Sequence, residues 1–112
     1  TVDCFNNKSV MASMGSIFRI NCHYIYFDDF QKLFPEHITY GTSLDGVNIS
    51  STKLKTKSTI VIGNESNGVS KEIVDKININ VRIQGYGKAE SLNVSVATGI
   101  ILNELAKINP QK

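Results

Sequence analysis

Short apolar segments alternate with helical patterns along most of the chain. Enrichment in β-branched and aromatic residues predicts strands over 16–20, 37–41, 59–62 and 79–83. Helices are predicted over 8–14, over 28–34 and after Ser70. A longer helix is predicted over 91–107, with Ser91 as its N-cap and apolar residues at helical spacing. This order predicts an α/β fold with a mostly parallel sheet and flanking helices, in one domain over residues 1–112.

Three glycine-containing loops follow predicted strands, over 40–46, 63–68 and 83–93. In an open α/β sheet, ligands bind beyond the carboxyl ends of the strands, and glycine lets the backbone approach a ligand closely. The loops therefore predict a ligand site at this edge. The alternative is ordinary turn and cap chemistry, in which Glu65 is a solvated acid, Ser91 a cap and Asn93 a first-turn residue.

Composition and charge exclude several classes of protein. Hydrophobic residues make up 41% of the 112 residues and no apolar run is long enough to span a bilayer, so a membrane protein is not predicted. The net charge of +2 permits a nucleic-acid partner without requiring one. Cys4 and Cys22 have no metal-like spacing and are expected to be free thiols in a reducing compartment. His23 and His37 stand alone, so no metal site is predicted.

Two segments resemble a known family. "IVIGNESNGVSKEI" (60–73) and "GKAESLNVSVATGIILNEL" (87–105) are similar to the second and third motifs of the SpoU/TrmH family of RNA ribose 2′-O-methyltransferases, in the SPOUT superfamily. "KSVMASMGSIFRI" (8–20) resembles the segment that precedes them. The similarity extends over nearly the whole chain.

The resemblance implies a C-terminal trefoil knot that holds S-adenosylmethionine, which is a rare topology. The expected cofactor contacts, which come from the three loops, are Thr42, Ser43, Leu44, Ile62, Gly63, Asn64, Ile83 and Leu92. The expected active-site residues are Glu65, Ser91 and Asn93. The implied activity is transfer of a methyl group to a ribose 2′-hydroxyl of tRNA or rRNA, by a cytoplasmic homodimer.

The chain departs from the family pattern in three ways. Met11 stands directly before "ASMG", where the family often has an arginine. The family's first motif, with an arginine that helps to activate the hydroxyl, is expected upstream of Thr1, so the resemblance predicts a domain that is incomplete at its N-terminus. Gln84 stands where the third motif usually has proline. A non-catalytic module that binds the cofactor or RNA therefore stays open as an alternative. Lys53, Lys55 and Lys57 are candidate phosphate contacts, or simply a solvated loop.

Overall fold

A computed structural model describes residues 2–87 and 91–109. The chain divides into two compact units, Thr1–Leu33 and Phe34–Lys112, and each is described by itself. The first unit contains α1 (Asn7–Ala12), a 3₁₀ turn η1 (Ser16–Phe18) and α2 (Phe27–Leu33). The second contains β1 (Ile38–Asn48), η2 (Ile49–Ser51), β2 (Ser58–Val61), α3 (Lys71–Val74), β3 (Ile79–Arg82) and α4 (Val94–Ile108). The assignment of residues 1–112 to one domain stays a prediction.

The first unit consists of short helices joined by turns. The strand predicted over 16–20 is wrong, because η1 occupies its first half. Met14 and Gly15 both have positive φ, at 48° and 83°, which turns the chain out of α1 and directly into η1. Backbone hydrogen bonds between residues three apart, the 3₁₀ pattern, then follow, including one from Arg19 N to Ser16 O at 2.8 Å. Local β propensity was overridden because a strand also needs a neighbour to pair with.

Tyr24 ties the segment after η1 to the N-terminal residues of the first unit. Its hydroxyl accepts a hydrogen bond from Cys4 N at 2.9 Å and donates one to Asp3 Oδ1 at 3.2 Å. Cys4 and Cys22 are free thiols, as predicted. Burial and a hydrogen bond with the Cys4 thiol raise the pKa of Cys22.

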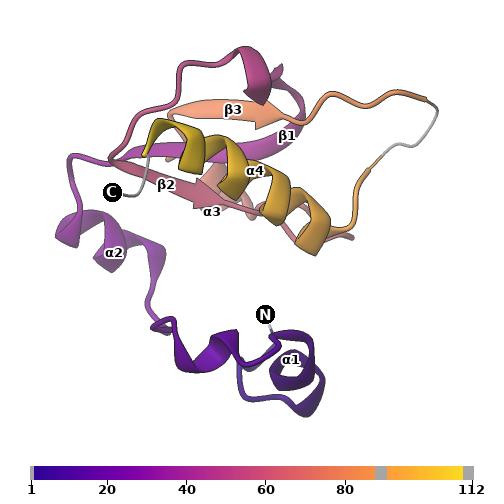
Figure 1. Ribbon diagram of the computed structural model, residues 1–112. Coiled ribbons are helices and arrows are strands. Elements are labelled where there is room, and N and C mark those ends of the chain that lie inside the picture. The colour runs from indigo at the N-terminus through magenta and orange to yellow at the C-terminus, as the bar shows by residue number, and fades with distance from the viewer. Residues whose placement is uncertain (1, 88–90, 110–112) are drawn as a thin grey trace. The chain divides into compact units, whose positions relative to one another are not determined.

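The second unit is built on a three-stranded parallel sheet with strand order β2-β1-β3 (Figure 1). This confirms the predicted α/β class, the parallel sheet and three of the four predicted strands. Since the strands run the same way, the segments that follow β2 and β3 leave the sheet at one edge. The helix α4 lies across one face of the sheet, and α3 connects β2 to β3 (Figure 1).

The central strand β1 is longer than predicted and contains a bulge. It continues to Asn48 instead of ending at Gly41. Thr42 and Val47 both pair with Val81, so residues 43–46 are extra residues that leave the ladder and return to it. Such insertions redirect side chains. Gly46 permits the return, because a Cβ there would lie 2.6 Å from the Val81 carbonyl carbon.

The core of this unit lies between the sheet and α4. It is formed by Tyr40, Ile49, Leu54, Val81 and Ile101. The Tyr40 side chain is fully buried, and its hydroxyl accepts a hydrogen bond from Lys55 N at 3.2 Å, which satisfies its polar atom. Tyr40 therefore packs in the core between the sheet and α4, and its hydroxyl also holds the loop that leads into β2.

The opposite face of β1 is covered near Gly41. A Cβ at Gly41 would lie 2.3 Å from Ile77 Cδ1, so Ile77 packs against the bare backbone of the strand. Asn78 then aligns the start of β3, because its backbone N–H donates to Thr39 O at 2.9 Å and its Oδ1 accepts from Thr39 N at 2.8 Å. Within residues 2–87 and 91–109, no helix has the length and apolar character that crossing a membrane requires.

Truncating Ile49 is expected to destabilise the protein. Its side chain is 1% exposed in the core, and Ile49→Ala should lower the free energy of unfolding by about 2–5 kcal/mol because it leaves a cavity. The matched control is Val47→Ala, two residues away and 54% exposed, with an expected loss below about 1 kcal/mol. Urea denaturation followed by circular dichroism measures both. Equal losses in the two variants would contradict this assignment of the core.

Candidate functional site

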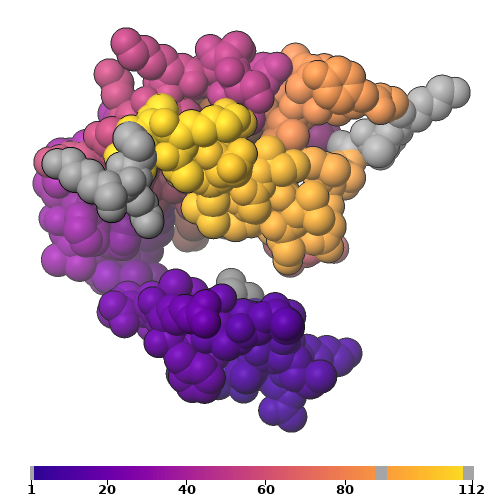
Figure 2. All heavy atoms as spheres, in the orientation of Figure 1, coloured from indigo at the N-terminus to yellow at the C-terminus, as the bar shows by residue number. Residues whose placement is uncertain are grey.

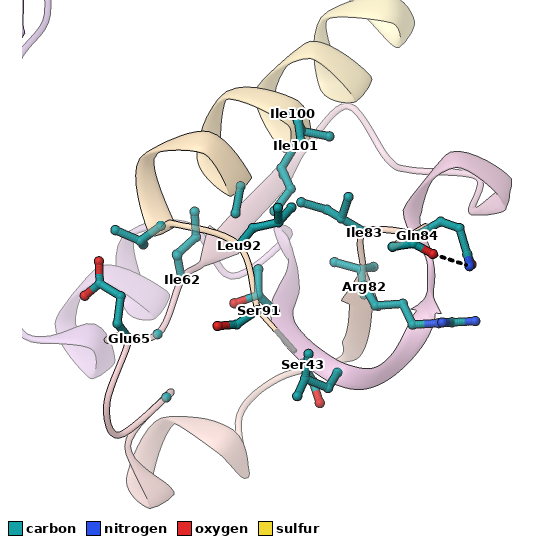
Figure 3. A pocket seen from close by; sticks show the side chains of 18 of the residues that line it. Ser43, Ile62, Glu65, Arg82, Ile83, Gln84, Ser91, Leu92, Ile100 and Ile101 are labelled. Carbon is teal, nitrogen blue, oxygen red and sulfur yellow. Dashed lines mark hydrogen bonds between the residues drawn. The ribbon is translucent and has the colours of Figure 1, made fainter. Parts of the chain in front are cut away.

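A pocket of about 710 Å³ opens at the carboxyl edge of the sheet (Figure 3). Three separate segments and the start of α4 surround it: the β1 bulge, the loop after β2 and the loop after β3. Its lining residues are Thr42, Ser43, Leu44, Ile62, Gly63, Asn64, Glu65, Gly68, Val81, Arg82, Ile83, Gln84, Gly85, Tyr86, Gly87, Ser91, Leu92, Val94, Ala97, Ile100 and Ile101. The three glycine-containing segments singled out in the sequence thus meet at one site.

Ten of the eleven predicted site residues line this pocket. All eight expected cofactor contacts do so, from Thr42 in β1 to Leu92 before α4, together with Glu65 and Ser91. Asn93 is the exception. Their gathering is a property of the fold, whereas their contacts with a ligand stay predictions.

The loop after β2 is held by its own hydrogen bonds. Asn64 N donates to Gly68 O at 3.0 Å and Gly68 N donates to Asn64 O at 2.8 Å, which closes the loop. The Asn64 side-chain oxygen accepts from Ser66 N at 2.9 Å and from Asn67 N at 3.3 Å. Gly68 takes a positive φ of 64°. Much of the polar character of "NESNG" is therefore turn chemistry, as the alternative interpretation expected.

Gly63 is required by close packing within the same loop. A Cβ there would lie 2.4 Å from the Gly68 carbonyl carbon and 2.6 Å from Val69 N. These are backbone atoms, so they cannot rotate away. Any side chain at Gly63 would distort the loop itself.

Asn93 is the N-cap of α4. Its side-chain oxygen accepts hydrogen bonds from Ser95 N at 2.9 Å and Val96 N at 3.4 Å, and the helix begins at Val94. The prediction of Ser91 as the cap is wrong by two residues. Both residue types cap helices well, and only the backbone geometry distinguishes them. The correction leaves the Ser91 hydroxyl outside the helix, at the pocket.

The pocket has an apolar floor and polar groups around it. Ile62, Ile83 and Leu92 lie below α4, and Ile101 is a residue of that helix (Figure 3). Glu65 is exposed and receives no hydrogen bond or ion pair from any described residue. An apolar cavity with a few free polar groups is typical of a small-molecule site.

Charge is unevenly distributed around the pocket. In Figure 3, Glu65 and Arg82 lie on opposite sides, with Ser91 and Leu92 between them. Arg82 is the last residue of β3 and forms no ion pair with a residue in the described part of the chain. One side of the pocket therefore favours a cation and the other an anion.

Sequence reasoning missed several residues of the site, including Arg82, Tyr86 and the α4 residues Ala97 and Ile100. Arg82 ends a predicted strand, so its place at the carboxyl edge was a usable signal. Tyr86 lies inside a loop that had been selected for its glycines. Ala97 and Ile100 lie in the helix predicted over 91–107, where apolar spacing alone does not separate pocket residues from core residues.

The three lysines considered for phosphate binding do not line the pocket. Lys57 directly precedes β2, whereas the pocket lies beyond the carboxyl end of that strand. Lys57 also forms an ion pair with Glu36, in which Lys57 Nζ lies 3.7 Å from Glu36 Oε1. The backbone N–H of Glu36 lowers the pKa of its carboxyl group, and the Lys57 ammonium acts in the same direction.

Among the residues that the structure describes, no three His, Cys, Asp or Glu side chains lie close enough together to hold a metal ion. His37 instead lies within hydrogen-bond distance of Thr59 Oγ1, at 3.1 Å, and its ring is near that of Phe34. Its place is structural, as the sequence suggested.

The fold and pocket are those of an α/β protein with a ligand site at the carboxyl edge of a parallel sheet. The model of the SpoU rRNA Methylase family matches residues 1–103. The chain belongs to this family.

Relatives with assigned activities are similar over much of the chain. The chain is 32% identical over 108 residues to the 23S rRNA (guanosine(2553)-2′-O)-methyltransferase RlmP of Bacillus subtilis. This match covers 94% of this chain and 44% of that protein. It is 44% identical over 70 residues to the tRNA (guanosine(18)-2′-O)-methyltransferase of Aquifex aeolicus. This second match covers 62% of this chain and 33% of that protein.

A solved structure supports the same placement. The AdoMet-bound rRNA methyltransferase from Sinorhizobium meliloti matches with a TM-score of 0.87 and 31% identity, over 99% of this chain and 44% of that one. The chain thus spans less than half the length of the relatives it matches here.

Replacing Asn93 tests whether it acts as a cap. Asn93→Ala should lower the free energy of unfolding by about 1 kcal/mol, because Ser95 N and Val96 N lose their acceptor. Asn93→Ser should restore most of this loss. Ser91→Ala is the matched control and should stay within about 0.5 kcal/mol of the wild type. A larger loss for Ser91→Ala than for Asn93→Ala in thermal or urea denaturation would place the cap at Ser91 instead.

Proposed function

We propose that this chain forms the S-adenosylmethionine-binding part of an RNA methyltransferase that acts on a ribose 2′-hydroxyl. The observation that carries the proposal is the convergence of the eight expected cofactor residues, from three separate segments, on one pocket. The names of the rRNA and tRNA 2′-O-methyltransferases to which the chain is similar support the activity. A relative that binds AdoMet supports the cofactor.

The pocket fits the cofactor in size and character. Its volume of about 710 Å³ lies within the range for sites that enclose small molecules, about 300–1,000 Å³. The apolar floor around Ile62, Ile83 and Leu92 suits the adenine and the thioether carbons, and the free Glu65 carboxylate suits a cationic ligand. The cofactor, when bound, supplies a methyl group activated by the sulfonium charge.

The residues of the chain would bind and orient the ribose. A ribose hydroxyl is a poor nucleophile at neutral pH, so it needs alignment and a hydrogen-bond acceptor for its proton. The Glu65 carboxylate has its lone pairs free of described donors and can serve as that acceptor. Ser91 can hydrogen-bond a neighbouring ribose oxygen. Asn93, whose side chain caps α4, positions the segment that carries Ser91 and Leu92.

Finer features of the family belong to the same proposal. A trefoil knot at the C-terminal end is proposed from membership of the family alone. A single methyltransferase domain over residues 1–112 and a place in the cytoplasm, where tRNA and rRNA are modified, remain predictions. The choice between tRNA and rRNA stays open, because relatives of both kinds match.

Binding of S-adenosylhomocysteine tests the pocket. The wild-type chain should give saturable heat on calorimetric titration. Leu92→Glu should weaken binding by more than about tenfold, because it buries a charge against the apolar floor. Leu92 is 47% exposed, and the matched control is Val74→Glu, 44% exposed and outside the pocket, which should bind as the wild type does. Absence of binding by a folded wild-type chain, or equal affinity in Leu92→Glu, would contradict the cofactor assignment.

We also propose that α4 contributes to a homodimer. Its atoms, yellow in Figure 2, are visible at the surface over much of the helix. Val96 and Leu102, on the side away from the buried Ile101, are more than half exposed, and Gly99 between them leaves open space. A second copy would cover this apolar stripe.

Replacing Leu102 tests the dimer. Sedimentation velocity should give the mass of two chains for the wild type and of one chain for Leu102→Glu, since a charge in an apolar interface lacks a partner. Val74→Glu, an equally charged change on α3, should leave the dimer intact. A wild-type protein that sediments as one chain at all concentrations would exclude this role for α4.

A further inference from the structure

Tyr86 is exposed to a degree that folding does not explain. Its side chain is 96% exposed, although it borders the pocket. The hydroxyl and ring have no hydrogen bond or ring contact with a described residue. The buried Tyr40 and the hydrogen-bonded Tyr24 both support the fold, and Tyr86 supports nothing around it. An uncovered aromatic ring at the mouth of a pocket offers both of its faces to a ligand.

The backbone around Tyr86 keeps the ring accessible. Gly85 and Gly87 flank it, and a Cβ at either position would meet no atom within 4 Å. Gly87 has φ of +138°, a conformation that favours glycine. Neither neighbour has a side chain that could cover the ring, so a planar ligand can reach its faces.

A cation and an amide lie on the same stretch of chain. Arg82 borders the pocket without an ion pair to any described residue, and Gln84 donates a hydrogen bond through Nε2 to Gly85 O at 3.2 Å (Figure 3). Arg82 and Tyr86 thus lie four positions apart and border the same pocket. Proteins hold unpaired nucleotides with this pair of groups, because an aromatic ring stacks on a base and a cation contacts a phosphate.

We infer that Tyr86 is the platform on which an unpaired nucleobase of the substrate RNA stacks at the mouth of the pocket, with Arg82 contacting the adjoining phosphate. This inference rests on the proposed function and adds how the RNA is held. It makes Tyr86 a positioning residue, because the stacked base places its nucleotide next to Glu65 and Ser91.

Affinity for single-stranded RNA tests the inference. The probe is a fluorescein-labelled, unstructured RNA of twelve nucleotides, followed by fluorescence anisotropy. Tyr86→Ala should weaken binding about 5- to 150-fold, the effect of losing one stacked base, and Tyr86→Phe should bind within about twofold of the wild type. Tyr26→Ala is the matched control, at 84% exposure, and should leave affinity unchanged. Thermal unfolding should be the same for all three variants.

Salt dependence separates the role of Arg82 from that of Tyr86. Arg82→Gln should reduce the slope of log affinity against log salt by about 0.7, the value for one phosphate contact to a single strand. Tyr86→Ala should leave the slope unchanged while lowering the affinity at every salt concentration. A slope that falls in Tyr86→Ala, or unchanged affinity in that variant, would overturn the inference.

Titration with S-adenosylhomocysteine distinguishes the two sources of a nucleobase. Unchanged affinity for this ligand in Tyr86→Ala, together with weaker RNA binding, supports stacking on RNA. Weaker binding of the cofactor product with unchanged RNA affinity would assign the ring to adenine and overturn the inference while the proposed function stands. Absence of cofactor binding in the wild type would instead overturn the proposed function.

Discussion

The central strand β1 positions every part of the pocket. Both neighbouring strands hydrogen-bond to β1 and not to one another, so the loops that follow β2 and β3 have their relative places set by its register. The bulge over 43–46 brings Ser43 and Leu44 to the same edge, and it closes only because Gly46 lies against the Val81 backbone. Tyr40 holds this strand between the α4 face and the loop before β2. The shape of the pocket is thus a consequence of one strand's pairing.

Two asparagines in the motifs have structural roles in the folded chain. The Asn64 and Asn93 side chains each accept two backbone N–H groups, one pair closing a loop and the other starting a helix. Those hydrogen bonds fix the backbone beside Glu65 and Ser91, whose own polar groups stay unpaired among the described residues. A motif can therefore require a residue for its place in a turn or a cap, where it holds the adjacent residue at the edge of the pocket.

The sequence could predict the parts of this fold that depend on local pattern. The strands β2 and β3 are short apolar segments followed by glycine-containing loops, and parallel pairing brings such loops to one edge. The bulge could not be predicted, because it depends on Val81 pairing with both Thr42 and Val47. The strand expected over 16–20 failed because pairing partners, not β propensity, decide whether a strand forms. The cap of α4 was misplaced because Ser91 and Asn93 are equally suited to capping, and only the packed helix selects between them.

Electrostatics at this pocket favours the proposed stacking of a base. The net charge of +2 gives the chain little general attraction for a polyanion. The lysines before β2 lie at the amino end of that strand, and Lys57 is already near Glu36. At the pocket, Glu65 repels phosphate but suits a sulfonium cation, and Arg82 lies on the other side. A nucleotide is then best held by a neutral interaction on its base with one cation on its phosphate, which is the combination that Tyr86 and Arg82 offer.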